Sequence, residues 1–128
     1  SRKIRLNKNI ILHKPFGFID YVALQISSKA TLSDSGTINE ESSILNFPAL
    51  NLRNAHERPE GMEEGAVMMT GIGKDRVLQG LEILNSQKRG LERTIHPVKD
   101  YSYENVSEKI PRIILSYVNY INSNVWKK

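Results

Sequence analysis

The chain has 128 residues, of which 39% are hydrophobic and 25% charged, and this composition indicates a single soluble globular domain. It contains no cysteine, which excludes disulfides and thiolate metal sites and fits a reducing compartment, so we expect a cytoplasmic protein. No apolar run approaches the roughly 20 residues that cross a bilayer and no signal peptide is recognisable, so we expect no membrane partner. The net charge of +4 is mild, and no aromatic residues interleave with the basic clusters, which favours scattered solvated charge over a nucleic-acid surface.

The first third of the chain predicts alternating strands and helices. The apolar run Ile10–His13 is consistent with a buried strand, and from Phe18 onward the apolar spacing becomes helical. Residues 30–33 predict the next strand. The helix after it is expected to begin near Thr37, which with Glu40 three residues later matches a capping box.

The second helix carries an unusual charge. Glu41 falls on its apolar side, where an ionised carboxylate needs a partner because burying an unpaired charge is costly. Pro48–Leu52 predicts a third strand, and a polar loop follows over 53–64. Pro59 and Gly61 argue against a long helix within this loop.

The remainder of the chain continues the alternation. Ala66–Met69 predicts a fourth strand and a helix is expected from Asp75, whereas 86–105 is polar and gives no clear prediction. Ile110–Val125 keeps a helical period, with Pro111 expected in the first turn. Repeated strand–helix units predict the α/β class, with a parallel sheet and helices on its faces.

Two loops follow predicted strands and therefore belong to the carboxyl edge of the sheet, where such folds bind ligands. In the first loop the backbone amides of Ser35, Gly36 and Thr37 could hold a phosphate at a helix N-terminus; the alternative is an ordinary strand–helix turn. Glu41 could accept hydrogen bonds from a ribose diol, or it could be a surface or salt-bridged glutamate.

Arg58 in the second loop suits the planar recognition of a phosphate, and the alternative is a local ion pair with Glu57 or Glu60. His56-Glu57 resembles the start of a zinc-binding helix, but no second histidine follows, so we expect no metal site and no metal cofactor. The remaining histidines, His13 and His96, have no partner at ligand spacing, and no Ser/His/Asp arrangement can be defended.

Several of these motifs agree in order and spacing with one protein family. They are Pro15–Val22, Asp34–Glu41, Pro48, Arg53, Glu57–Glu60, Gly65 and Gly71. Over roughly residues 10 to 84 the chain resembles the non-hydrolysing UDP-N-acetylglucosamine 2-epimerases. His56, residues 61–64 and the tail 117–126 look most like the branch that makes UDP-N-acetyl-L-fucosamine precursors for capsule or O-antigen.

The resemblance implies a Rossmann-like, three-layer half-domain with a parallel sheet, forming part of the second domain of a GT-B-like two-domain enzyme. Residues 1–128 would be a single, partial C-terminal nucleotide-binding domain. The terminal helix, 106–126, would pack on the absent first domain. The family's main acid and base residues are expected outside this chain.

Binding roles are also implied by the resemblance. Ser35 and Gly36 would hold the diphosphate with Thr37 beside them, where the family has a second glycine. Glu41 would bind the ribose, and Arg58 the diphosphate or the sugar. The positions near the uracil would be Tyr21 and Phe16, the latter where the family often has a polar residue; His56 replaces a usual threonine.

The implied reaction is inversion at C2 of a UDP-N-acetylhexosamine, by elimination of UDP to a 2-acetamidoglycal and re-addition. We expect no cofactor, a UDP-sugar substrate and a homodimeric parent enzyme. Two other classes stay open: a non-catalytic nucleotide- or anion-binding module, and the donor-binding domain of a glycosyltransferase.

Overall fold

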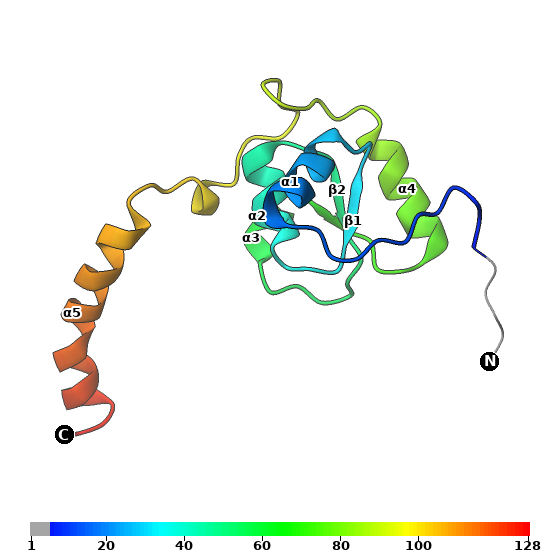
Figure 1. Cartoon of the computed structure of the whole chain (residues 1–128). Helices are drawn as coiled ribbons and strands as arrows, with labels where there is room; N and C mark the ends of the chain where they lie inside the picture. The colour runs from blue at the N-terminus through cyan, green and yellow to red at the C-terminus, as the bar shows by residue number, and fades with distance from the viewer. Residues whose placement is uncertain (1–5) are drawn as a thin grey trace, which may run out of the picture.

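The computed structural model describes residues 6–128 and shows a small α/β body from which the C-terminal helix projects (Figure 1). The elements, in chain order, are α1 (Phe18–Ser27), β1 (Thr31–Ser33), α2 (Ile38–Leu45), β2 (Ala49–Asn51), α3 (Pro59–Glu63), β3 (Met68–Met69), α4 (Lys74–Leu84), the 3₁₀ helix η1 (Lys99–Tyr101) and α5 (Val106–Asn124). The predicted α/β class is confirmed. The helix predicted from Phe18 and the strands predicted at 30–33, 48–52 and 66–69 are present as well.

Three short strands form a parallel sheet in the order β1-β2-β3. Thr31 pairs with Ala49 and Leu50 pairs with Met68, so β2 is the central strand. Since side chains alternate across a strand, neighbouring residues of β2 face opposite layers. All three strands end at the same edge, which places the loops that follow them next to one another.

The two faces of β2 are covered by different helices, which gives the predicted three layers. On one face Ala49 belongs to a core cluster with Ile38 of α2, Phe47 and Val67. On the other face Leu50 contacts α4 so closely that a Cβ added at Gly80 would lie 2.9 Å from Leu50 Cδ2. A glycine at that position therefore lets α4 approach the sheet.

Residues 86–98, for which the sequence made no clear prediction, cap the C-terminal ends of α1 and α2. The guanidinium of Arg93 donates to the carbonyls of Ser43 and Ile44 at 2.8 and 2.9 Å. Arg89 donates to the carbonyls of Ile26 and Ser28. These cations satisfy carbonyls that a helix end leaves without partners, and they lie at the negative ends of both helix dipoles.

The end of α2 is further secured by Asn46, which has a left-handed backbone conformation (φ 53°). Its side chain is buried, and its Nδ2 donates to the carbonyls of Gly90 and Glu92 at 2.8 and 2.6 Å. The amide of Val98 donates to Ser43 Oγ at 2.9 Å. The loop is thus a structural clamp on α2.

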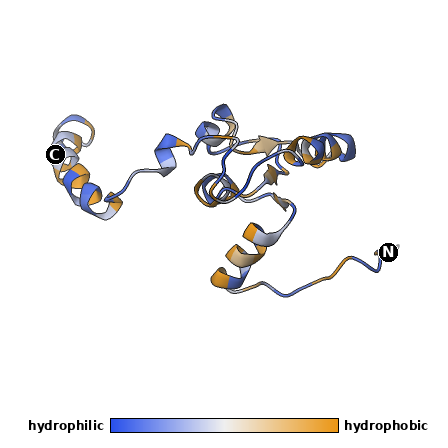
Figure 2. Cartoon of the chain, turned by 90° about the horizontal axis from the view of Figure 1, so that it is seen from above, coloured by the Kyte–Doolittle hydropathy of each residue, from blue (hydrophilic) through white to orange (hydrophobic). Residues whose placement is uncertain are grey.

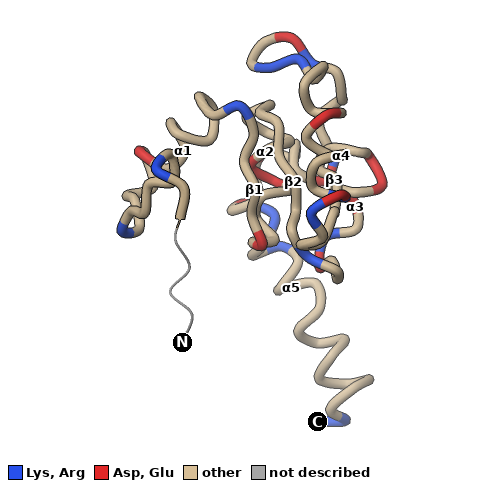
Figure 3. Tube along the Cα trace, turned by 90° about the vertical axis from the view of Figure 1, so that its right-hand side faces the viewer, with Lys and Arg blue, Asp and Glu red and all other residues tan. Residues whose placement is uncertain are grey.

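Two helices keep much of their apolar surface in solvent. Phe18 and Ile19 at the start of α1 are 74% and 76% exposed, and Figure 2 shows hydrophobic residues on α1 where it stands out from the sheet. In α5 no residue is buried, and its large apolar side chains are exposed except for the half-buried Ile121. Acidic and basic residues are interspersed over the body (Figure 3).

Two sequence predictions about secondary structure are wrong. Ile10–His13 forms no strand, and Ile11 and Leu12 are more than three-quarters exposed. In the described residues β1 pairs with β2 alone, so this segment has no neighbouring strand to supply hydrogen bonds. Pro111 lies in the second turn of α5 because the helix begins at Val106, and its ring nitrogen cannot donate to the carbonyl of Ser107.

No helix among residues 6–128 combines the length and apolar character that crossing a bilayer requires.

We predict that Asn46→Asp lowers the free energy of unfolding by at least about 2 kcal/mol, because two carbonyls would lose their donor and face a carboxylate instead. Aspartate tolerates the left-handed conformation nearly as well as asparagine, so the backbone adds little to the change. Urea unfolding followed by circular dichroism measures the effect. Asn119→Asp, on the exposed surface of α5, is the matched control and should shift stability by less than about 0.5 kcal/mol. Equal stability of the two variants would show that the clamp contributes nothing.

Candidate functional site at the carboxyl edge of the sheet

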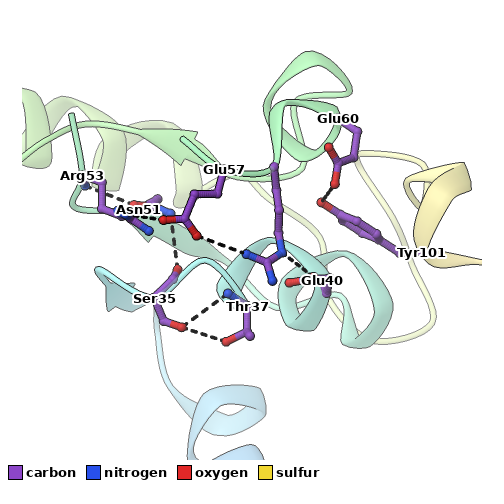
Figure 4. Close-up of polar contacts among 9 residues, drawn as sticks. Ser35, Thr37, Glu40, Asn51, Arg53, Glu57, Glu60 and Tyr101 are labelled. Atoms are coloured by element: carbon purple, nitrogen blue, oxygen red, sulfur yellow. Dashed lines mark hydrogen bonds and ion pairs between the residues drawn. The ribbon is translucent and has the colours of Figure 1, made fainter. Parts of the chain in front are cut away.

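The candidate site lies where the loop after β1 meets the loop after β2. Asn51, the last residue of β2, joins the two loops. Its Nδ2 donates to the carbonyl of Ser35 at 3.4 Å, and its Oδ1 accepts from the amide of Arg53 at 3.1 Å (Figure 4). The parallel register brings both loops to this edge, as the sequence predicts.

The turn between β1 and α2 is held by its own hydroxyl groups. The amide of Ser35 donates to Ser33 Oγ at 3.1 Å, and the amide of Thr37 donates to Ser35 Oγ at 3.3 Å. The hydroxyls of Ser35 and Thr37 lie 2.8 Å apart and point toward each other (Figure 4). Two of the three amides expected to bind phosphate are therefore engaged, whereas the Gly36 amide donates to no acceptor among the described residues.

The predicted capping box is wrong. Thr37 has helical backbone angles (φ −64°, ψ −15°) and its side chain caps no amide. Glu40 does not reach back to Thr37, because it accepts a hydrogen bond from Arg58 instead, with 2.5 Å between Arg58 Nε and Glu40 Oε1. Glu40 is thus part of the site, and the capping pattern concealed that role.

Arg58 carries the positive charge of the site. Besides Glu40, its Nη1 lies 3.8 Å from Glu57 Oε2. The hydrogen bond that Arg58 donates to Glu40, together with the negative charge of Glu40, raises the pKa of Arg58 above its ordinary value. The local ion pair anticipated with Glu57 or Glu60 thus involves Glu57 and, at shorter range, Glu40; Glu60 instead accepts from Tyr101 Oη at 2.9 Å.

Gly36 leaves the space that the guanidinium of Arg58 occupies. A Cβ at position 36 would overlap Arg58 Nη1, so the absence of a side chain lets the guanidinium lie against the turn. The two predicted anion-binding residues, separated by more than twenty positions in the sequence, are therefore in contact. Arg58 keeps 31% of its side chain exposed and remains accessible to a ligand.

Glu57 is held by a second arginine. Arg53 Nη2 lies 2.8 Å from Glu57 Oε1 in an i,i+4 pair. The hydrogen bond from Arg53 lowers the pKa of Glu57, and the charge of Arg58 lowers it further. Glu57 therefore links both arginines at the surface of the loop.

Glu41 points away from Arg58, toward α1. Gln25 of α1 donates through Nε2 to Glu41 Oε2 at 2.5 Å, which supplies the partner that the sequence demands for this carboxylate. Tyr21 precedes Gln25 by one helical turn on the same face of α1 and is half-buried. Glu41 and Tyr21 thus lie at the junction of α1 with α2.

Phe16, the other residue expected near a base, precedes α1. Its ring is 45% exposed and packs against His13, with the ring centroids 5.0 Å apart. The structure brings Ser35, Gly36, Thr37 and Arg58 together at one end of α2, whereas Phe16 lies in the segment before α1 and packs against His13.

Three contributors were missed by sequence reasoning: Gln25, Asn51 and Tyr101. Burial raises the pKa of Tyr101 above its ordinary value, and the hydrogen bond to Glu60 raises it further. A polar residue within an otherwise apolar helix face is the signal that could have identified Gln25. Asn51 and Tyr101 gave no such signal, because their partners come from distant segments.

The arrangement suits a ligand with a negative group at one end and hydroxyl groups at the other. Arg58, the Gly36 amide and two hydroxyls offer donors for a phosphate, and Glu41 offers an acceptor. Among residues 6–128 no group of three or more His, Cys, Asp or Glu side chains is placed to hold a metal ion.

Comparison with known proteins gives a consistent answer. A family model described as UDP-N-acetylglucosamine 2-epimerase matches residues 1–115. The UDP-N-acetylglucosamine 2-epimerase of Methanocaldococcus jannaschii is 36% identical over 87 residues, which are 68% of this chain and 24% of that protein.

Solved structures agree with the sequence matches. The UDP-N-acetylglucosamine 2-epimerase from Rickettsia bellii is 54% identical and superposes with a TM-score of 0.78 over 88% of this chain and 31% of its own. The Methanocaldococcus jannaschii enzyme in complex with UDP-GlcNAc and UDP is 31% identical, with a TM-score of 0.72 over 86% of this chain and 29% of its own. The chain thus spans 24% to 31% of the length of these relatives.

We predict that Arg53→Met raises the pKa of Glu57 toward its ordinary value, since the hydrogen bond from Arg53 is the main cause of the lowered pKa. A lowered folded-state pKa stabilises the fold above the unfolded-state pKa, and this contribution is lost as the pH falls through the folded-state value. The variant should therefore have a smaller contribution above the unfolded-state pKa, and what remains should be lost at a higher pH than in the parent chain. Carboxyl ¹³C shifts followed by NMR between pH 2 and 7 measure the Glu57 pKa. Arg112→Met on α5, the helix that projects from the body, is the control, and an unchanged Glu57 pKa in Arg53→Met would contradict the prediction.

Proposed function

Since this chain belongs to the UDP-N-acetylglucosamine 2-epimerase family, we propose that it is the UDP-binding part of a UDP-N-acetylhexosamine 2-epimerase. In this proposal residues 1–128 form a partial C-terminal domain, the later part of the second domain of a GT-B-like enzyme. The single observation that carries the proposal is the contact of Arg58 with the Gly36 turn, with Glu41 one helical turn farther along α2.

The diphosphate of UDP binds at the Gly36 turn. Its oxygens accept from the Gly36 amide and from the hydroxyls of Ser35 and Thr37, and they compete with Glu40 and Glu57 for Arg58. A planar guanidinium can bind two phosphate oxygens at once. Arg58 and its carboxylate partner Glu40 are partly exposed, so a phosphate can reach the guanidinium and replace the carboxylate.

The nucleoside extends from this turn toward α1. Glu41 accepts hydrogen bonds from the ribose hydroxyls, and Tyr21 lies near the uracil. Phe16, which precedes α1, would have to leave its contact with His13 to reach the base. The assignments of Tyr21 and Phe16 rest on the resemblance and on the position of both residues at or before the start of α1.

The proposed reaction inverts C2. Loss of the C2 proton and cleavage of the C1–O bond give a 2-acetamidoglycal and UDP, whose diphosphate takes the electrons of the C1–O bond. UDP then adds again at C1 and a proton adds to C2 from the opposite face, which completes the inversion at C2. Arg58 and the Gly36 turn stabilise the charge that develops on the departing diphosphate, which is an electrostatic contribution. The acid and base for the C2 proton belong to other parts of the enzyme.

Finer assignments extend the same proposal. His56 and residues 61–64 support a role in UDP-N-acetyl-L-fucosamine synthesis for capsule or O-antigen, in a cytoplasmic, homodimeric parent enzyme. The segment 106–126 is proposed to pack on the first domain. The exposed apolar side chains of α5 support this assignment, since a solvent-facing helix seldom carries so many.

One other function is favoured by a specific observation. The donors at the Gly36 turn and the Glu41 carboxylate suit the binding of a nucleoside diphosphate, and a module that binds UDP without catalysing a reaction would need only these. Assaying the polypeptide for C2 inversion of UDP-GlcNAc, and for sugar transfer, separates the epimerase from this module and from a glycosyltransferase donor domain.

We predict that UDP shifts the amide resonances of Ser35, Gly36, Thr37 and Glu41 in an NMR titration of the 128-residue chain. Arg58→Ala should weaken binding at least about tenfold, because it removes a charge-assisted contact worth about 1.5–3 kcal/mol. Arg112→Ala, which removes an arginine of α5, the helix that projects from the body (Figure 1), should leave the affinity unchanged.

Two results would contradict the proposed site. One is equal UDP affinity in Arg58→Ala and the parent chain. The other is a set of shifts spread over the basic clusters of the chain, since that pattern indicates unspecific charge attraction.

A further inference from the structure

The burial pattern of α1 is unusual. Within this helix, which the structure describes in full, Gln25 is the one buried residue and is 2% exposed. Leu24 and Ile26, the apolar neighbours on either side, are nearly half exposed. The helix therefore turns an amide toward α2, one turn after the half-buried Tyr21 and Val22.

This amide is only half satisfied. Its Nε2 donates to Glu41 Oε2, but its Oε1 is buried and accepts no hydrogen bond among the described residues. Leaving a buried acceptor without a partner costs stability, and an apolar side chain of similar length would avoid that cost. Glu41 is half-buried, so water can replace Gln25 as its hydrogen-bond partner, and stability of the fold alone does not explain a glutamine at position 25.

The effect of Gln25 on Glu41 does explain it. With Oε2 held by Gln25, the other carboxylate oxygen, Oε1, accepts no hydrogen bond among the described residues and is not buried. A neutral amide orients the carboxylate and leaves its negative charge in place, whereas a lysine or arginine partner would neutralise that charge. The carboxylate thus keeps both its charge and an open oxygen for a ligand.

We propose that Gln25 is a positioning residue that holds Glu41 in the orientation in which it recognises the ribose hydroxyls of a nucleoside diphosphate. The inference rests on the proposed function, since it requires Glu41 to meet a ribose. It adds a second helix to ribose recognition: α2 supplies the carboxylate, and α1 sets its direction.

The preference for UDP over its 2′-deoxy analogue tests the proposal, because a purely structural role of Gln25 would leave this preference unchanged. The affinities of the 128-residue chain for UDP and for 2′-deoxyuridine 5′-diphosphate are measured by NMR titration, and their ratio is compared among variants. The parent chain should prefer UDP about tenfold, as expected for one hydrogen bond to a charged acceptor. In Gln25→Met the ratio should fall to about threefold or less, while the melting temperature stays equal or rises.

Three variants complete the design. Glu41→Gln should also lower the ratio, and adding Gln25→Met to it should change the ratio no further, because the two residues act through one interaction. Arg58→Ala should weaken both ligands equally and keep the ratio. Gln79→Met, at an exposed glutamine of α4, should change neither ratio nor stability.

The outcomes distinguish the proposed role of Gln25 from the proposed role of Glu41. A normal ratio in Gln25→Met together with a lowered ratio in Glu41→Gln overturns the role of Gln25 and leaves the proposed function standing. An unchanged ratio in Glu41→Gln, or no preference for UDP in the parent chain, overturns the ribose assignment itself. If Gln25→Met does not fold, the claim that position 25 is not kept for stability fails. Gln25→Asn, whose amide is one methylene shorter and cannot reach Glu41 in the same way, then decides the effect on the ratio.

Discussion

The ion pair between Arg58 and Glu40 is the interaction on which the candidate site depends. It connects the loop after β2 to α2, across a turn that only a glycine leaves open at position 36. Both partners are about 70% buried as side chains, which is enough to fix their geometry and still admits a competing anion. A guanidinium held in this way is preorganised, because little further ordering is needed when a diphosphate binds.

The helix α2 separates binding from stability along its length. Its N-terminal half carries Glu40 and Glu41, which face two different neighbours, Arg58 and Gln25. Its C-terminal end is held by the loop 86–98: Arg93 donates to a carbonyl of the helix, and the buried amide of Asn46 donates to carbonyls of the loop. Because the clamp lies at the far end, the ligand-facing end can remain polar and partly open without losing the position of the helix.

Much of the fold could be predicted because local pattern and register suffice for a small parallel sheet. The periodicity located α1, α2, α4 and the three strands to within a few residues. It failed at Ile10–His13, since a strand exists only where a neighbour offers hydrogen bonds, and at Thr37–Glu40, since a capping box competes with any stronger partner for the glutamate. For Glu41 the prediction was correct but incomplete. Its place on an apolar face predicted a partner, but the sequence did not indicate that the partner is Gln25.

The sequence by itself determined the α/β class, the motif of the family and the residue types that suit a nucleotide, because these depend on spacing along the chain. Tertiary structure alone decided which carboxylate binds Arg58, that Gly36 makes room for it, and that residues 86–98 clamp α2. The physical reason is the same in each case. Ion pairs, close approach and capping of carbonyls join atoms from segments far apart in sequence, and their choice of partner is settled only when the whole body has packed.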